Sequence, residues 1–326
     1  MTTIYREADA NLSLLSGKTV GIIGYGNLGR SLAMNLRDSR VRVMIGLRED
    51  ETRDHARQDG FDPGDIERVV PRCHILLLLL SNVVLPEVYL ERISPYLQRG
   101  HLLVFASGYN LAFGYVEPPP FVDVGMIAPR TIGAAVRSRY LEGSGFYSFV
   151  GVAQDATGTT LGSLLALAMA MGSLRAGAIE VSPAQEAQLD LFVQQAILPA
   201  FQHVMTTAAA LLLQQGYPPE AVMLDLILSG EFTDYLSRAS QDGLLHALRL
   251  SSLTGQYGIF SRLPRFQELK LEGLMDAILE EIRRGDFAAE WSREYENGYP
   301  NLSKLLQAQE QLTLWALEQG TLDRLK

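Results

Sequence analysis

The stretch "TVGIIGYGNLGRSL", residues 19–32, indicates the fold of the N-terminal part of the chain. Residues 19–24 are small or apolar and predict a buried strand, and residues 29–39 predict a helix. Between them, glycines at 24, 26 and 29 have the G-x-G-x-x-G spacing that lets a pyrophosphate approach the start of a helix. The spacing therefore favours a dinucleotide site over a purely structural turn. The predicted contacts are Gly24, Tyr25, Gly26, Asn27, Leu28 and Gly29.

The rest of the first half alternates strands with helical segments. Further apolar strands are expected at 41–47, 74–80, 102–107, 122–128 and 146–153. Near-continuous apolar strands separated by helices are typical of a parallel sheet that is covered on both faces. We therefore predict an α/β Rossmann domain over residues 1–181.

After residue 181 the strand pattern stops. Residues 185–216 have helical periodicity and are apolar on more than one side, which predicts a buried core helix. More helical segments follow to the C-terminus. The prediction for residues 182–326 is an all-helical domain.

Composition limits the class of protein. The chain has 326 residues, 47% of them apolar, a net charge of −9 and no lysine- or arginine-rich block, so a nucleic-acid partner is not expected. The single Cys73 excludes an internal disulfide and suits a reducing compartment. The apolar run at 75–80 is too short to span a bilayer, and the first residues lack the pattern of a secretory signal. These features predict a cytoplasmic protein without a membrane partner.

The second strand leads into "GLREDETRDHAR", residues 46–57, where the adenosine ribose of a dinucleotide is expected. Arg48 and Arg53 could hold a 2′-phosphate or stack on adenine. Glu51 and three neighbouring carboxylates instead suit a free 2′-hydroxyl. The balance between these arginines and carboxylates slightly favours NADH over NADPH as the cofactor. The alternative is that these charged side chains form a solvated loop.

Many motifs occur in one order along the chain: "GKTVGIIGYG", "NLRDS", "GLRE", "SGYNLAFG", "PPPFVDVGMIAPR", "AQDATG", "RAGAIE", "DLFVQQA" and "GDFAAEW". With them the sequence resembles the short, bacterial ketol-acid reductoisomerases nearly from end to end. The resemblance implies a Rossmann domain followed by a helical, knotted domain. It also implies a homodimer whose active sites are each built from two chains.

The resemblance implies chemistry as well. Members of the family convert a 2-aceto-2-hydroxy acid to a 2,3-dihydroxy acid by a magnesium-dependent alkyl shift and a hydride transfer. Four carboxylates on two helices hold two Mg²⁺ ions. This sequence keeps Asp190, has Gln194 in place of a glutamate, and offers Asp225 and Ser229 on the second helix. Because two anions are lost, we predict a degenerate site that does not bind Mg²⁺.

Two further catalytic positions differ from the family pattern. Arg130 in "APRTIG" replaces a lysine, and Ser107 in "ASGYN" replaces a histidine. Arg130 could bind a substrate anion or form a structural ion pair, and Ser107 could donate a hydrogen bond to a substrate oxygen. Asn82 and Gly133 match cofactor-contact positions of the family.

The substrate pocket is expected around four residues. Gln194 lies one turn after Asp190, and Phe201 replaces a family glycine, which would reshape the pocket. The serine that grips the substrate carboxylate in the family corresponds to Ser251 or Ser252 in "RLSSLTGQYG". The sequence leaves this choice open.

An intact glycine-rich turn beside a changed metal site favours one function at this point. We expect an NAD(P)H-dependent reductase that transfers hydride to a small C=O or C=N substrate, such as a 2-keto acid or a cyclic imine, without alkyl migration. The alternatives are a genuine reductoisomerase with an unusual metal site and a non-catalytic, cofactor-binding dimeric partner.

Overall fold

The computed structural model describes residues 2–325, which form two compact units, one ending at Asp190 and the other beginning at Leu191. The first unit contains a nine-stranded sheet in the order β1-β9-β8-β7-β6-β5-β2-β3-β4. The strands are β1 Ile4–Tyr5, β2 Thr19–Ile23, β3 Arg42–Leu47, β4 Pro63–Asp65, β5 Ile75–Leu78, β6 Leu102–Phe105, β7 Asp123–Pro129, β8 Ser148–Gln154 and β9 Ala178–Glu180.

The central strands confirm the predicted Rossmann arrangement, because β4, β3, β2, β5, β6 and β7 are parallel neighbours. The prediction of a wholly parallel sheet is wrong at one edge. There β8 runs antiparallel to β7, with Ser148 opposite Pro129, and β1 runs antiparallel to β9. Apolar composition signals that a strand is buried, but it does not encode the direction of the strand.

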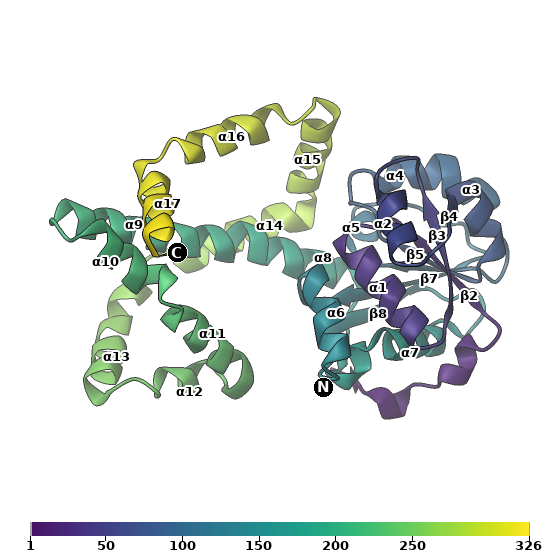
Figure 1. Ribbon diagram of the computed structural model, residues 1–326, viewed down its shortest axis with the longest axis horizontal. Helices are drawn as coiled ribbons and strands as arrows, with labels where there is room; N and C mark the ends of the chain where they lie inside the picture. Colours follow the sequence, from purple (N-terminus) through teal and green to yellow (C-terminus); the bar gives the residue numbers. More distant parts are fainter. Residues whose placement is uncertain (1, 326) are drawn as a thin grey trace. The chain divides into compact units, whose positions relative to one another are not determined.

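Helices cover both faces of this sheet (Figure 1). Successive strand side chains point to opposite faces, so Ile22 packs with residues of α1 and α7 while Ile23 packs with residues of α3 and α4. The helices of the first unit are α1 Asn27–Asp38, α2 Thr52–Gln58, α3 Ile66–Val69, α4 Leu85–Val88, α5 Tyr109–Ala112, α6 Gly133–Leu141 and α7 Thr160–Met171. Helix α8 Pro183–Phe192 begins in this unit and ends in the second.

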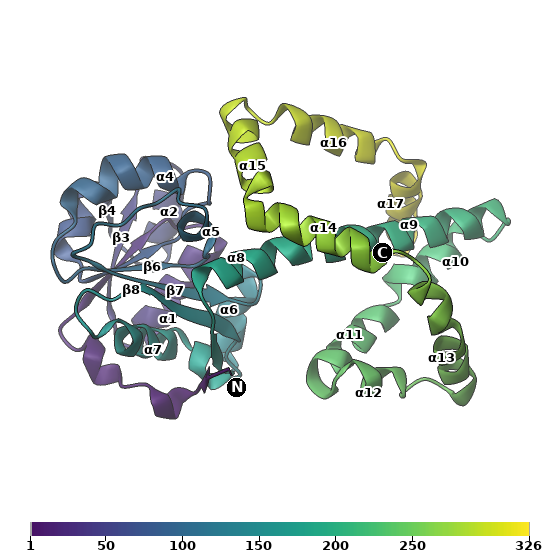
Figure 2. The same ribbon diagram turned by 180° about the vertical axis from the view of Figure 1, so that it is seen from behind.

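The second unit is helical, as predicted. Its small core contains Ala209, Val222 and Met223, with partly buried Leu314 and Leu317 of α17 packed against them. Figure 2 shows the helices of this unit, α9 to α17. The helices are α9 Leu198–Gln214, α10 Pro219–Met223, α11 Glu231–Asp242, α12 Leu244–Leu248, α13 Leu253–Gln267, α14 Leu271–Arg284, α15 Asp286–Glu296, α16 Pro300–Glu310 and α17 Thr313–Leu325.

The helix predicted at 185–216 is present as one continuous helix, Pro183–Gln214, formed by α8, a π-helical segment Val193–Ile197 and α9. It is not the buried core helix that the sequence suggested. Only 11% of its most apolar window, with a mean hydropathy of 1.5, is buried, and Leu198, Val204 and Leu211 are more than half exposed. By length and composition alone this helix could cross a membrane. An apolar pattern on several helix faces does not specify what covers them.

Candidate functional site

The three glycines of the turn after β2 have different physical roles. Gly24 has φ +103°, and a Cβ there would lie 2.7 Å from the carbonyl oxygen of Leu79. A Cβ on Gly29 would lie 2.2 Å from the carbonyl oxygen of Gly24. Gly26 has open space where its Cβ would point, with nothing within 4 Å. The backbone packing of the turn therefore requires glycine at positions 24 and 29, whereas Gly26 leaves room for a ligand.

A cleft of about 220 Å³ opens beside this turn. Gly26 is the N-cap of α1 and no side chain caps that helix, so its first N–H groups are available to an anion. The cleft is lined by Gly24, Tyr25, Gly26, Gly46, Leu47, Arg48, Asp50, Thr52, Ile66, Leu79, Leu80, Ser81 and Val84. These features fit the pyrophosphate and adenosine parts of a nicotinamide dinucleotide. Asn27, Leu28 and Gly29 form the first turn of α1 beside the cleft.

A polar cluster supports the turn from behind. The Tyr25 hydroxyl donates a hydrogen bond to Asp59 at 3.0 Å, and Arg30 donates two to the same carboxylate at 2.6 and 2.7 Å. The Tyr25 ring also packs edge-on against Phe61, with centroids 6.0 Å apart. Burial is the largest reason that the pKa of Tyr25 is raised, and the bond to Asp59 raises it further. Asp59, which sequence reasoning missed, thus fixes the residue between the first two glycines.

The adenosine end of the cleft combines charges of both signs. Arg48 and Asp50 both line it, together with Thr52, whose backbone N–H donates to Asp50 at 2.9 Å. Glu51, the predicted ribose ligand, is exposed at the N-cap position of α2 and is not among the lining residues. The lining carboxylate is Asp50, one residue earlier, because the chain turns into α2 at this point.

Arg53 does not line this cleft either. Its guanidinium donates to Asp65 at 2.6 Å and to the carbonyl oxygens of Arg48 and Leu47 at 2.9 and 3.2 Å. Glu49 adds a longer ion pair at 3.7 Å. Arg53 therefore stabilises the loop through these bonds, whereas the sequence suggested that it contacts a 2′-phosphate or adenine.

Gly133 and Asn82 lie near the same turn. A Cβ on Gly133 would come within 2.9 Å of the Leu28 nitrogen, and its carbonyl oxygen accepts a hydrogen bond from Ser31 at 2.8 Å. Asn82 follows a cleft-lining serine, and its amide oxygen lies 3.5 Å from the amide nitrogen of Asn110. Gly133 is thus packed against the glycine-rich turn, whereas Asn82 follows a lining residue in the sequence and does not itself line the cleft.

A second cluster lies at the ends of β6 and β7, where α8 begins. Arg130 bridges two carboxylates, donating to Glu186 at 3.1 Å and to Asp190 at 3.0 Å, and its guanidinium lies 5.0 Å from the centre of the Phe149 ring. Of the two alternatives for Arg130, the structure shows the ion pair. The Glu186 side chain is only 2% exposed. Sequence reasoning missed Glu186, although its spacing of four residues from Asp190 on one helix was a usable signal.

The turn that carries Ser107 is bound to the same carboxylate. Gly108 donates its backbone N–H to Glu186 at 2.6 Å, and the Ser107 hydroxyl lies at 3.5 Å. Burial is the main reason that the pKa of Glu186 is raised, and the neighbouring charge of Asp190 raises it further, while the Gly108 N–H and Arg130 oppose the shift. The planar guanidinium of Arg130 is suited to orienting anions through its N–H donors.

The expected metal-ligand positions carry less negative charge than a pair of Mg²⁺ ions usually requires. One carboxylate oxygen of Asp190 accepts the bond from Arg130, and Gln194 and Ser229 carry no charge. Within residues 2–325 no three His, Cys, Asp or Glu side chains are grouped to hold a metal. Gln194 and Asp225 nevertheless both lie in π-helical segments, Val193–Ile197 and Leu224–Leu228, a distortion that is frequent at functional sites.

The remaining predicted substrate residues lie in the second unit. The Phe201 ring packs at a tilt against Phe232, with centroids 5.7 Å apart. Ser252 caps α13, since its hydroxyl accepts the backbone N–H of Gly255 at 3.1 Å. Ser251 is exposed beside it. The Ser252 hydroxyl accepts this cap and can still donate its own O–H, so the choice between the two serines stays open.

A parallel sheet, a glycine-rich turn with open space at its second glycine, and a free helix N-terminus define a nicotinamide-dinucleotide-binding oxidoreductase of the Rossmann type. Comparison with known families identifies the group. Residues 14–177 match "Acetohydroxy acid isomeroreductase, NADPH-binding domain", and residues 184–324 match "Ketol-acid reductoisomerase, C-terminal domain". The chain belongs to the ketol-acid reductoisomerase family.

Individual relatives match over nearly their whole length. The ketol-acid reductoisomerase (NADP(+)) of Caldivirga maquilingensis is 36% identical over 94% of this chain and 93% of its own. The ketol-acid reductoisomerase (NAD(P)(+)) of Metallosphaera sedula is 37% identical over 99% and 95%. The structure of an NADH-preferring ketol-acid reductoisomerase from an uncultured archaeon superposes with a TM-score of 0.91 at 30% identity, covering 97% of each chain.

These comparisons overturn one prediction. The sequence favoured a reductase without alkyl migration, because the changed metal positions were given more weight than the rest of the chain. Similarity to ketol-acid reductoisomerases through both domains contradicts that prediction and supports its alternative, a genuine reductoisomerase.

Proposed function

We propose that this protein is a ketol-acid reductoisomerase that converts a 2-aceto-2-hydroxy acid to a 2,3-dihydroxy acid with hydride from NAD(P)H. The observation that carries the proposal is similarity through both family domains together with an intact dinucleotide cleft. Incubation with 2-acetolactate and either reduced cofactor tests it. Steady consumption of NADH or NADPH that depends on 2-acetolactate is the expected result.

Within the first unit, the chain's own residues would hold and orient the reactants. The bound dinucleotide would supply the hydride. The carboxylates of Glu186 and Asp190 hold the Arg130 guanidinium in place, and the Gly108 N–H fixes the Ser107 turn against Glu186. Polar groups that are held in place in this way need little reorganisation during a reaction in which an oxygen becomes more negative.

We further propose that NADH is the preferred cofactor. Asp50 lines the adenosine end of the cleft, where a carboxylate accepts the ribose 2′-hydroxyl and repels a 2′-phosphate. Arg53 is bound to Asp65. A similar chain of known structure is described as NADH-preferring, which supports the same preference here.

The changed metal positions give a test of the metal requirement. The Gln194→Glu variant is expected to lower the Mg²⁺ concentration needed for half-maximal turnover by roughly tenfold, because it restores an anion one helical turn from Asp190. Turnover of 2-acetolactate is measured against Mg²⁺ concentration. Gln195→Glu, which adds the same charge at the next position, is the control and should leave the midpoint nearly unchanged. Equal midpoints for Gln194→Glu and the unchanged protein would contradict this assignment.

We also propose that the protein is a homodimer. Apolar side chains of α9, among them Leu198, Phe201, Val204 and Leu211, are between 43% and 56% exposed. Exposed apolar surface of this kind is usually covered by a partner, and the resemblance to the family implies a second copy of the chain. Light scattering at micromolar concentration is expected to give twice the mass of one chain. A mass of one chain would contradict the proposal, and so would binding to lipid vesicles in its place.

A further inference from the structure

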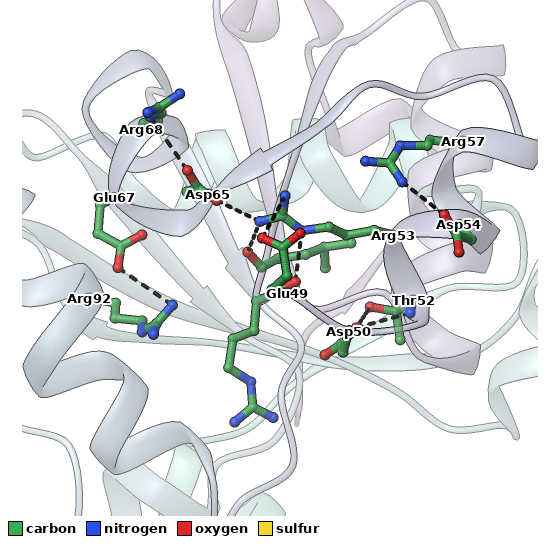
Figure 3. Close-up of polar contacts among 12 residues, drawn as sticks. Glu49, Asp50, Thr52, Arg53, Asp54, Arg57, Asp65, Glu67, Arg68 and Arg92 are labelled. Atoms are coloured by element: carbon green, nitrogen blue, oxygen red, sulfur yellow. Dashed lines mark hydrogen bonds and ion pairs between the residues drawn. The ribbon is translucent and has the colours of Figure 1, made fainter.

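Arg53, in the first turn of α2, lies next to the cleft, and several neighbouring groups bind its guanidinium. Its side chain is 12% exposed. The guanidinium makes three hydrogen bonds, one to the carboxylate of Asp65 and two to the carbonyl oxygens of Leu47 and Arg48 (Figure 3). Leu47 and Arg48 both line the cleft. Arg53 therefore lies directly behind the cleft wall, with its charge turned toward Asp65.

Asp65 is placed there by the sheet. Strand β4 pairs in parallel with β3 so that Asp65 lies opposite Leu47 at the carboxyl edge. The Asp65 side chain is 42% exposed, and its second oxygen lies 3.5 Å from Arg68. The hydrogen bond from Arg53 is the main reason that the pKa of Asp65 is lowered, so this carboxylate is ionised at neutral pH.

We propose that Asp65 determines cofactor specificity by position, because it holds Arg53 away from the place where the 2′-phosphate of NADPH would bind. This inference rests on the proposed role of the cleft in dinucleotide binding. While the pair is formed, the Arg53 charge is balanced and Asp50 is the acidic group that faces the ribose. When the pair is broken, the guanidinium keeps its two bonds to carbonyl oxygens and the longer contact with Glu49, and its charge can turn toward a 2′-phosphate bound beside Arg48.

The test uses the full-length protein and the Asp65→Asn variant. Asparagine keeps the size of the side chain and remains a good residue for the N-cap of α3. Dissociation constants for NADH and NADPH are measured by the fluorescence of the reduced nicotinamide. The variant is expected to shift the NADPH-to-NADH affinity ratio about tenfold toward NADPH, the change that one new charge-assisted hydrogen bond gives.

Two further variants separate this mechanism from a general change in charge. Glu67→Gln removes an acid two residues away that pairs with Arg92 at 3.6 Å, and it should leave the ratio unchanged. The double variant Asp65→Asn/Arg53→Gln should return the ratio to that of the unchanged protein. An unaltered ratio in a normally folded Asp65→Asn protein overturns the inference, and so does an equal shift in the double variant. If the unchanged protein binds neither cofactor, the proposed function fails together with this inference.

Discussion

The Gly26→Ala variant is expected to fold normally and to bind NADH about 100-fold more weakly than the unchanged protein. The expected loss corresponds to about 2–3 kcal/mol, the usual cost of forcing a methyl group into a tight contact. Nothing in the structure lies within 4 Å of the added Cβ, so the folded chain itself has no reason to move. The added methyl instead points into the space that the pyrophosphate needs.

Gly29→Ala is the matched comparison. Its Cβ would lie 2.2 Å from the Gly24 carbonyl oxygen, a backbone atom that cannot move without opening the turn. This variant should lose both stability and binding. Thermal unfolding with and without NADH separates the two cases. A Gly26→Ala protein that binds NADH as tightly as the unchanged protein would show that the pyrophosphate does not lie at this turn.

Replacing Arg130 by methionine should destabilise the first unit by about 3–5 kcal/mol, the range observed when one partner of a buried ion pair is removed. The reason is Glu186, whose side chain is 2% exposed and would lose Arg130, its cationic partner. Asp190 would lose the same partner, at 3.0 Å. The rate of 2-acetolactate turnover should also fall strongly, because Ser107 and the Gly108 N–H are positioned through Glu186.

Urea unfolding measures this effect. Arg130→Lys, which keeps the charge, should recover more than half of the lost stability. The double variant Arg130→Met/Glu186→Gln should also recover stability, because the buried side chain is then neutral and can still accept the Gly108 N–H. A loss below about 1 kcal/mol in Arg130→Met would mean that the pair behaves like an exposed surface ion pair.

Much of the first unit was predictable because its signals are local. The glycine spacing at 24, 26 and 29 and the apolar run at 75–78 each depend on neighbouring residues only, and the structure has the turn and the strand there. The direction of β8 was not predictable, since it depends on which edge of the sheet the chain reaches after α6. Strands β1, β4 and β9 are two or three residues long, too short for any period to show.

Only those parts of the site that lie within a single sequence motif were predictable. The role of Arg53 depends on Asp65, which the pairing of β3 with β4 brings beside it from twelve residues away. Glu186 contacts Arg130 from 56 residues away, so no local pattern connects them. The reaction was predicted wrongly because a few altered positions, chiefly Gln194, Ser229 and Arg130, counted for more in the prediction than a resemblance that runs through both domains.

We propose that this chain moves an alkyl group before it transfers hydride. Nuclear magnetic resonance of the product formed from 2-acetolactate, NADH and Mg²⁺ tests it most directly. Migration followed by reduction yields 2,3-dihydroxy-3-methylbutanoate, whose C2 proton is a singlet, and this is the expected product. Reduction without migration yields 2,3-dihydroxy-2-methylbutanoate, whose C3 proton is split into a quartet by its methyl group, and that product would contradict the account.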